Sequence, residues 1–219
     1  MSAIFVRSLP FGLYIGLLAL EGVLRDHATG FDVRWLYPLK AGVVALSLVV
    51  LWRHYTELHK YGLRLRQLSL SLAVGVAVLV LWVNLEAGWM LLGETGAGYD
   101  PRDAEGRIDW LLVAFRIAGA ALVVPIMEEL FWRSFLQRWL QQSDFLALDP
   151  GRVGVKALLM ASALFAVEHV QWFAGLIAGL AYGWLYMHTR NLWAPVIAPA
   201  TTNGLLGAYV LTTEQWRFW

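Results

Sequence analysis

The sequence predicts an all-α membrane protein, a polytopic bundle of about seven to eight transmembrane helices. Of its 219 residues, 59% are hydrophobic and only 15% are charged, a balance that is unusual for a soluble domain of this size. The apolar residues gather into runs of about 20, the length that crosses a bilayer as a helix. No run alternates polar and apolar residues with period two, as the strands of a membrane barrel do.

Seven apolar runs are expected to form helices, because lipid offers the backbone no hydrogen-bonding partner. The fourth run continues as a helix to about residue 141, which is too long for one upright crossing, and Pro125 is expected to kink it. Its amphipathic end, RSFLQRWLQQ, is expected to lie along or beyond the membrane surface. The expected ranges are 8–24, 34–53, 68–90, 109–127, 153–170, 172–188 and 192–211.

The chain ends give two expectations. The first run is followed by no small-residue cleavage site, which indicates a retained helix rather than a signal peptide. The tail EQWRFW fits either an interfacial aromatic anchor or plain packing of Trp216 and Trp219. With no repeat or linker between the runs, residues 1–219 are expected to form a single integral membrane domain.

The loop charges predict the orientation. Basic residues follow the second, fourth and sixth runs, whereas the loop GETGAGYDPRDAEGR after the third is acidic and rich in glycine. Because cytoplasmic loops carry the excess of lysine and arginine, the N-terminus is expected in the cytoplasm. The net charge of +1 gives no support for binding nucleic acid. The basic residues are Arg53, Lys60, Arg64 and Arg66, then Arg138, Arg152 and Lys156, then Arg190.

Gly175, Gly179 and Gly183 recur every four residues in the sixth run. A stripe of this kind lets a neighbouring helix approach closely, so it is interpreted as a packing surface.

Ionisable residues inside the apolar runs are candidates for function, because each costs at least about 2.5–3.5 kcal/mol at the centre of a membrane helix. Lys40, Glu86 and His188 lie near run ends, where a long side chain can reach the surface. Glu21 and Arg116 lie deeper and are expected to be structural partners of other polar groups. The remaining ones are Glu128, Glu129, Arg133, Glu168 and His169.

Glu128, Glu129 and Arg133 form the strongest cluster. Glu129 and Arg133 are four residues apart and share a helix face, so the arginine is expected to hold Glu129 ionised and oriented. Glu128 points about 100° away and has no local cation. This spacing favours Glu128 as a general base, braced by its neighbours, although EExxxR alone is also compatible with a plain ion-pair network.

His169 and Asn203 lie at a similar depth in other helices. At about 1.5 Å per residue, Glu128, His169 and Asn203 all fall roughly 18–24 Å from the same side. Each alone is more typical of a satisfied polar residue. Three such groups at one level indicate one site.

The ordered motifs EExxxR (128–133), FxxxH (165–169) and LWAP (192–195) followed by Asn203 resemble the CAAX protease and bacteriocin-processing family. These are intramembrane endopeptidases related to the Rce1-type prenyl-protein protease. The resemblance covers about residues 110–211. The segments EELFWRSFL and NLWAPVIA are especially similar to bacterial members associated with exosortase systems.

This resemblance implies a membrane-associated peptide or protein substrate and a bacterial inner membrane location. It also implies roles for five residues: Glu128 activates water, His169 assists, Glu129 and Arg133 brace the first motif, and Asn203 helps to hold the oxyanion. One position departs from the family pattern, because Pro199 stands where the family has a histidine. Proline has no donor, so another group substitutes, or activity is impaired, or this chain carries an altered residue.

Other chemistries remain open at this point. No cofactor is favoured, since H-E-x-x-H is absent and only His169 lies at the right depth, but Glu128, Glu129 and His169 are legitimate zinc ligands. A cysteine nucleophile is excluded, as the chain has no cysteine. A membrane scaffold or substrate-binding homologue would tolerate Pro199. A proton-coupled transporter is disfavoured because no inverted repeat is seen.

Overall fold

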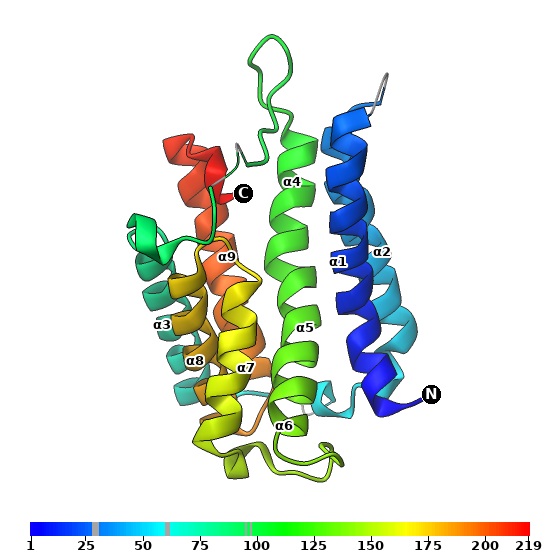
Figure 1. Ribbon diagram of the computed structural model, residues 1–219, viewed down its shortest axis with the longest axis vertical. Coiled ribbons are helices and arrows are strands. Elements are labelled where there is room, and N and C mark those ends of the chain that lie inside the picture. Colours follow the sequence, from blue (N-terminus) through cyan, green and yellow to red (C-terminus); the bar gives the residue numbers. More distant parts are fainter. Residues whose placement is uncertain (28–30, 60–61, 95, 97) are drawn as a thin grey trace.

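The computed structural model describes residues 1–27, 31–59, 62–94, 96 and 98–219 and shows a bundle of helical rods (Figure 1). No named strand occurs among these residues, so the all-α prediction is confirmed. Lys60 of the basic loop lies outside the described residues. The helices are α1 (Ala3–His27), α2 (Leu36–Leu51), α3 (Leu65–Trp82), α4 (Trp110–Ala118), α5 (Val124–Glu128), α6 (Gln137–Trp139), α7 (Val155–Val167), α8 (Trp172–Thr189) and α9 (Trp193–Thr213).

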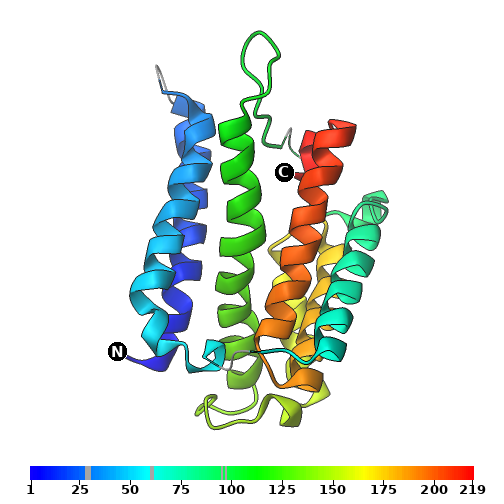
Figure 2. The same cartoon turned by 180° about the vertical axis from the view of Figure 1, so that it is seen from behind.

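The fourth rod stands in the middle of the molecule. It runs without a break from α4 to α6, with π-helical turns at Gly119–Val123 and Glu129–Leu136. The paired helices α1 and α2 lie on one side of it, and α3, α7, α8 and α9 lie on the other (Figures 1 and 2). The two ends of the chain lie toward opposite ends of the bundle (Figure 1).

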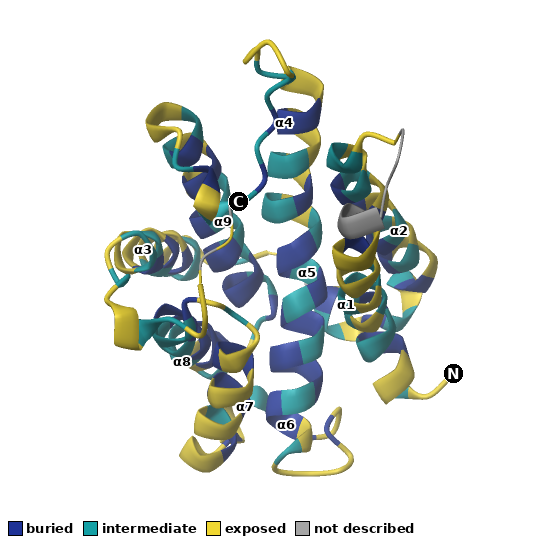
Figure 3. Cartoon of the chain, turned by 45° about the horizontal axis from the view of Figure 1, so that its top comes forward, coloured by how far each residue is buried: buried dark blue, intermediate teal, exposed yellow. Residues whose placement is uncertain are grey.

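Four helical segments are long and apolar enough to cross a membrane: Ala3–Leu24, Val33–His54, Leu65–Trp82 and Trp110–Trp139. Helix α7 is apolar but has only 13 residues. Large apolar side chains are exposed on the outside of the rods, among them Leu46 and Val49 on α2, whereas the middle of the central rod is buried (Figure 3). An apolar exterior of this kind is suited to lipid.

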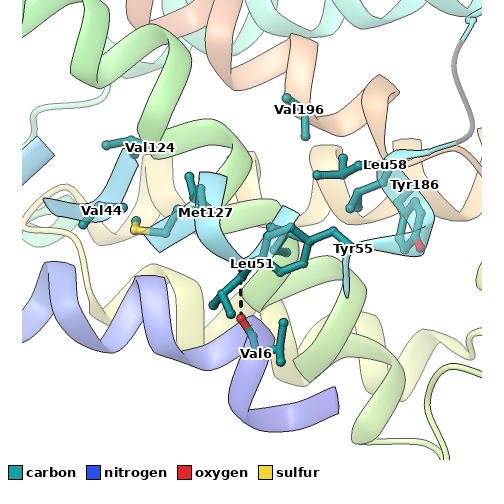
Figure 4. Packing of buried hydrophobic residues seen from close by; sticks show 12 residues of the cluster. Val6, Val44, Leu51, Tyr55, Leu58, Val124, Met127, Tyr186 and Val196 are labelled. Atoms are coloured by element: carbon teal, nitrogen blue, oxygen red, sulfur yellow. Dashed lines mark hydrogen bonds between the residues drawn. The ribbon is translucent and has the colours of Figure 1, made fainter. Parts of the chain in front are cut away.

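The core is continuous across the two halves of the bundle. Val6, Tyr55, Met127 and Val196 come from α1, the loop after α2, the central rod and α9, and they belong to one buried cluster (Figure 4). The Tyr55 hydroxyl donates a hydrogen bond to the Val6 carbonyl at 3.2 Å. This cluster holds α1 and α2 against the rod that carries the first motif.

Several helix ends differ from the expected ranges, and two of them bear on the site. Helix α3 ends at Trp82 rather than at 90, and the Asn84 amide donates back to the Val80 carbonyl at 2.7 Å, which competes with continued helix. Helix α7 ends at Val167, so His169 lies in the turn before α8 instead of within a helix. The Gln171 side chain donates to the Trp82 carbonyl at 2.9 Å and pins this turn to α3.

The central rod adds detail to two further predictions. The rod continues through Pro125, where a kink is expected, and the Val124 N–H donates to the Gly119 carbonyl in a π-helical turn that precedes the proline. The segment RSFLQRWLQQ packs into the bundle, because Ser134, Gln137 and Arg138 are buried. Their hydrogen bonds explain the burial: the Arg138 guanidinium donates to the Ser134 carbonyl at 2.6 Å.

The glycine stripe of α8 is confirmed as a packing surface. A Cβ atom on Gly179 would lie 3.0 Å from Ser162 Cα, and one on Gly175 would lie 3.3 Å from Ala166 Cα. Helices α7 and α8 therefore touch nearly backbone to backbone, and this contact fixes the position of the turn that carries His169.

Candidate active site

A cavity of about 260 Å³ lies between the central rod and the helices around it. Its lining contains Glu128 from the rod, His169 from the turn between α7 and α8, and Asn203 from α9. The structure thus brings together three polar residues that are far apart in the sequence. Pro199 also contributes to the wall.

Glu128 is the last residue of α5, and a π-helical turn begins at Glu129. Glu128 is partly exposed to the cavity, whereas Glu129 is completely buried, so the neighbouring carboxylates point in different directions.

Glu129 and Arg133 form the expected pair. Arg133 Nε lies 3.3 Å from Glu129 Oε2, and both side chains are buried. The guanidinium also lies over the ring of Phe165, 4.7 Å from its centroid, which is a favourable cation–π position. The Phe165 ring is in turn 4.6 Å from the His169 imidazole. Arg133 therefore connects the first motif to the second through Phe165.

The imidazole of His169 is oriented by its own turn. Its Nδ1 atom lies 2.8 Å from the Phe165 carbonyl oxygen, and a carbonyl can only accept, so Nδ1 carries the proton. In the neutral ring, Nε2 is then left with a free lone pair. The edge of Trp82 packs against the ring, with centroids 5.4 Å apart. These contacts hold an imidazole acceptor at the cavity.

Asn203 is joined to the central rod. Its Nδ2 atom donates to the Ala120 carbonyl at 2.8 Å. In a π-helical turn this carbonyl would accept from residue 125, but Pro125 has no N–H. Asn203 therefore satisfies a backbone oxygen that the rod itself leaves open. The second N–H of this amide and its oxygen are not engaged by any hydrogen bond within the described residues.

Pro199 is buried in α9, which passes through it without a break. Nearby hydroxyl groups are engaged: Thr202 Oγ1 donates to the Gly75 carbonyl at 2.8 Å, and Tyr182 lies 2.9 Å from the same oxygen. Thr202 Oγ1 also lies 3.1 Å from the Ala198 carbonyl oxygen. Both hydroxyl groups therefore already have hydrogen-bond partners at the place where the family has a histidine donor.

Several lining residues were not expected from the motifs. The tyrosines Tyr14 and Tyr37, the tryptophans Trp82 and Trp219, and Phe218 all border the cavity. The hydroxyl of Tyr14 is a polar group inside an apolar run. Comparing the depths of tyrosines along their helices, as for Glu128 and His169, would identify it. Trp216 is buried, and Trp219 borders the cavity, so the tail packs against the bundle and is not a free anchor.

The deep charges also need one correction. Lys40 does not reach the surface; it is buried and its Nζ lies 2.8 Å from Glu21 Oε2. Glu21 is thus a structural partner, as expected. Glu86 and His188 are less buried than Lys40. Glu86 pairs with Arg217 at 2.9 Å, and His188 is exposed.

The described residues contain no group of three or more His, Asp or Glu side chains close enough to hold a metal ion. Glu128, Glu129 and His169, the zinc ligands that the sequence offers, are therefore not gathered as a ligand set. Glu129 is instead engaged by Arg133.

The fold and this cavity define an integral membrane protein with a polar site inside a helical bundle. Residues 110–205 match the family model described as Type II CAAX prenyl endopeptidase Rce1-like, so the family resemblance is confirmed and this segment is Rce1-like. All five motif residues lie inside the match, whereas α1 to α3 lie outside it. Comparison with curated proteins and with solved structures found no match.

Proposed function

We propose that this protein is an intramembrane endopeptidase that hydrolyses a peptide bond with a water activated by Glu128. The observation that supports it best is the presence of Glu128, His169 and Asn203 in the lining of one cavity. The match to an Rce1-like family supports peptide hydrolysis as the reaction. The cavity supports a substrate that is associated with the membrane.

The proposed reaction starts with a water molecule between Glu128 and His169. Glu128 takes a proton from the water while the water oxygen attacks the carbonyl carbon of the peptide bond. The protonated Glu128 carboxyl then passes that proton to the leaving nitrogen as the C–N bond breaks. His169 Nε2 accepts a hydrogen bond from the water and so directs the water oxygen toward the carbonyl carbon. The free N–H of Asn203 donates to the developing oxyanion. The Glu129–Arg133 pair, through the contact of Arg133 with Phe165, holds Glu128 and His169 in fixed positions relative to one another.

Pro199 supports a second candidate, a catalytically impaired scaffold or substrate-binding homologue. This residue lies in the cavity wall where a donor is expected, and the nearest hydroxyl groups are committed elsewhere. Loss of one oxyanion donor lowers the rate by about 10²–10³. The two candidates share the same cavity and differ only in whether the chemistry proceeds.

The finer assignments belong to the same proposal. We place the protein in a bacterial inner membrane with its N-terminus in the cytoplasm, as the loop charges favour. We propose a relationship to the exosortase-associated members of the family on the motif segments quoted above. We also propose that hydrolysis needs no metal, so a chelator should leave the rate unchanged.

The test compares four proteins reconstituted in lipid vesicles with a library of membrane-anchored tail peptides. Wild type should cleave a peptide, and Glu128→Gln should lower the rate by about 10²–10⁴, the usual contribution of a general base. Glu105→Gln, in the exposed acidic loop, is the matched control and should cleave like wild type. Pro199→His should raise the rate if the missing donor limits it.

Two results would decide against parts of this proposal. Equal cleavage by wild type and Glu128→Gln would remove Glu128 as the base. Absence of cleavage by wild type and by Pro199→His, with peptide binding retained, would favour the scaffold.

A further inference from the structure

Arg116 stands in a wall shared by two cavities. The first contains Glu128, and the second, of about 300 Å³, is bordered by Gly98 and Tyr99 of the acidic loop. Both cavities are lined by Tyr14, Tyr37, Arg116 and Trp219. Arg116 is therefore placed between the inner site and the loop end of the molecule.

The guanidinium of Arg116 is held in position without a carboxylate. It lies over Tyr37 at 4.1 Å and within 5.6 Å of the Tyr99 centroid. Its Nε atom is buried and has no hydrogen-bond partner, and no carboxylate of the described residues lies within ion-pair distance. The nearest acid of the second cavity, Glu21, is already paired with Lys40.

A cation that is oriented but unpaired is costly inside a membrane protein, and an anionic ligand would offset that cost. Arginine binds carboxylates in a two-pronged geometry, which makes a carboxylate the best fit. Glu128, an acid, lines the inner cavity together with Arg116. The wall of this cavity therefore carries both an acidic and a cationic side chain.

We propose that Arg116 is a specificity-determining residue that binds a carboxylate of the peptide substrate. This proposal rests on the proposed function for the identity of the ligand as a peptide. The carboxylate comes from the C-terminus of the peptide or from an Asp or Glu side chain near it.

The spacing of the rod predicts where that carboxylate lies along the substrate. Arg116 and Glu128 are 12 residues apart on one continuous helix, which is about 18 Å at 1.5 Å per residue. An extended peptide covers at most about 3.3–3.6 Å per residue. The carboxylate is therefore expected about five residues beyond the scissile bond, directed toward the acidic loop.

The experiment measures peptide binding in a Glu128→Gln background, in which cleavage is not required. Three fluorescent peptides are compared. Two share one sequence, with a free C-terminus in one and an amidated C-terminus in the other, and the third is the amidated peptide with its last residue replaced by glutamate. The free-acid peptide should bind at least about tenfold more tightly than the amide, and Arg116→Gln should remove this difference. Recovery of affinity by the glutamate peptide would assign the side-chain carboxylate as a sufficient source.

Two further variants make the test decisive. Arg116→Lys keeps the charge and should retain part of the preference, which guards against a folding defect in Arg116→Gln. Arg107→Gln changes an exposed arginine of the same loop region and should leave the preference intact. Equal affinity for the free-acid and amidated peptides in the background protein would overturn the proposal. A preserved preference without any cleavage by the wild type would instead overturn the proposed function and leave the carboxylate site standing.

Discussion

Arg133 is the residue on which the arrangement of the motif depends. It pairs with Glu129 and covers Phe165, whose ring and carbonyl both contact His169. The spacing of Glu129 and Arg133 predicts their contact because residues four apart share a helix face. The contact with Phe165 involves another helix and could not be predicted from spacing.

Replacing Arg133 with lysine tests this positioning role. Lysine keeps the charge but loses the planar group that stacks on Phe165. We expect kcat to fall roughly 10- to 100-fold with KM little changed, since small displacements of reacting groups are costly. Steady-state kinetics in vesicles measures both constants, with Arg138→Lys, a buried arginine remote from the cavity, as the control. A rise in KM at constant kcat would contradict the positioning role.

The partner of Asn203 shows what the sequence could not reveal at this scale. The sequence singles out Asn203 as a polar residue inside an apolar run, and the structure places it in the cavity lining. Its hydrogen bond to the Ala120 carbonyl depends on a π-helical turn in another helix. The expected effect of Pro125 was a kink, and periodicity alone gives no signal for a π-helical alternative.

At the scale of elements, the contact between α7 and α8 supports the turn that carries His169. The glycine spacing predicted a close approach, and the Cβ geometry at Gly179 agrees. The sequence predicts the end of α7 near residue 170, but the helix ends at Val167, because the chain reverses there before α8 begins at Trp172. Boundaries of this kind depend on tertiary contacts, such as that between Gln171 and Trp82.

Replacing Gly179 with alanine should separate these helices. The new methyl group would meet backbone at 3.0 Å, so we expect a loss of about 1–3 kcal/mol of stability and a lower Tm. Gly42→Ala is the matched control, because Gly42 lies inside α2 with no atom near its Cβ position. That change should stabilise by about 0.5–1 kcal/mol. Thermal unfolding in detergent measures both, and a similar Tm for the two variants would refute the tight contact.

At the scale of the whole molecule, a polar network joins α1, the loop after α2 and the central rod at one end of the bundle. Arg7 of α1 contacts Glu57 of the loop after α2 at 2.5 Å, and Ser134 and Arg138 of the central rod contact the same carboxylate. Burial alone would raise the pKa of Glu57, but hydrogen bonds and charge from Arg7 lower it below the usual value. This carboxylate is therefore expected to be ionised in the folded protein.

A lowered pKa makes stability depend on pH in one direction. The contribution of Glu57 is present above its unfolded value of 4.5 and is lost as the pH falls through the lower folded value. Glu57→Gln should lower stability at pH 7 by roughly 3 kcal/mol and should flatten the loss of Tm as the pH falls below 4.5. Glu105→Gln should behave like wild type. If Tm depended on pH in the same way for Glu57→Gln and for wild type, this role of Glu57 would be excluded.

The assembly of seven rods was predictable, because lipid requires long apolar helices and hydropathy reveals them. The packing of the tail was not. Two interpretations of Trp216 and Trp219 remained open until the structure showed the Tyr99 N–H donating to the Trp219 carbonyl at 3.0 Å. A Cβ atom on Gly98 would collide with the carbonyl of Trp216, so this position requires glycine. Contacts between segments more than 100 residues apart leave no local pattern.

The 13-residue length of α7 has a consequence for the surrounding lipid. At about 1.5 Å per residue this helix spans about 20 Å, while the hydrocarbon layer is about 30 Å thick. A helix this short is accommodated by local thinning of the bilayer or by flanking side chains that reach the interface. Thinning beside α7 would bring water closer to the turn that carries His169, where the proposed hydrolysis consumes it.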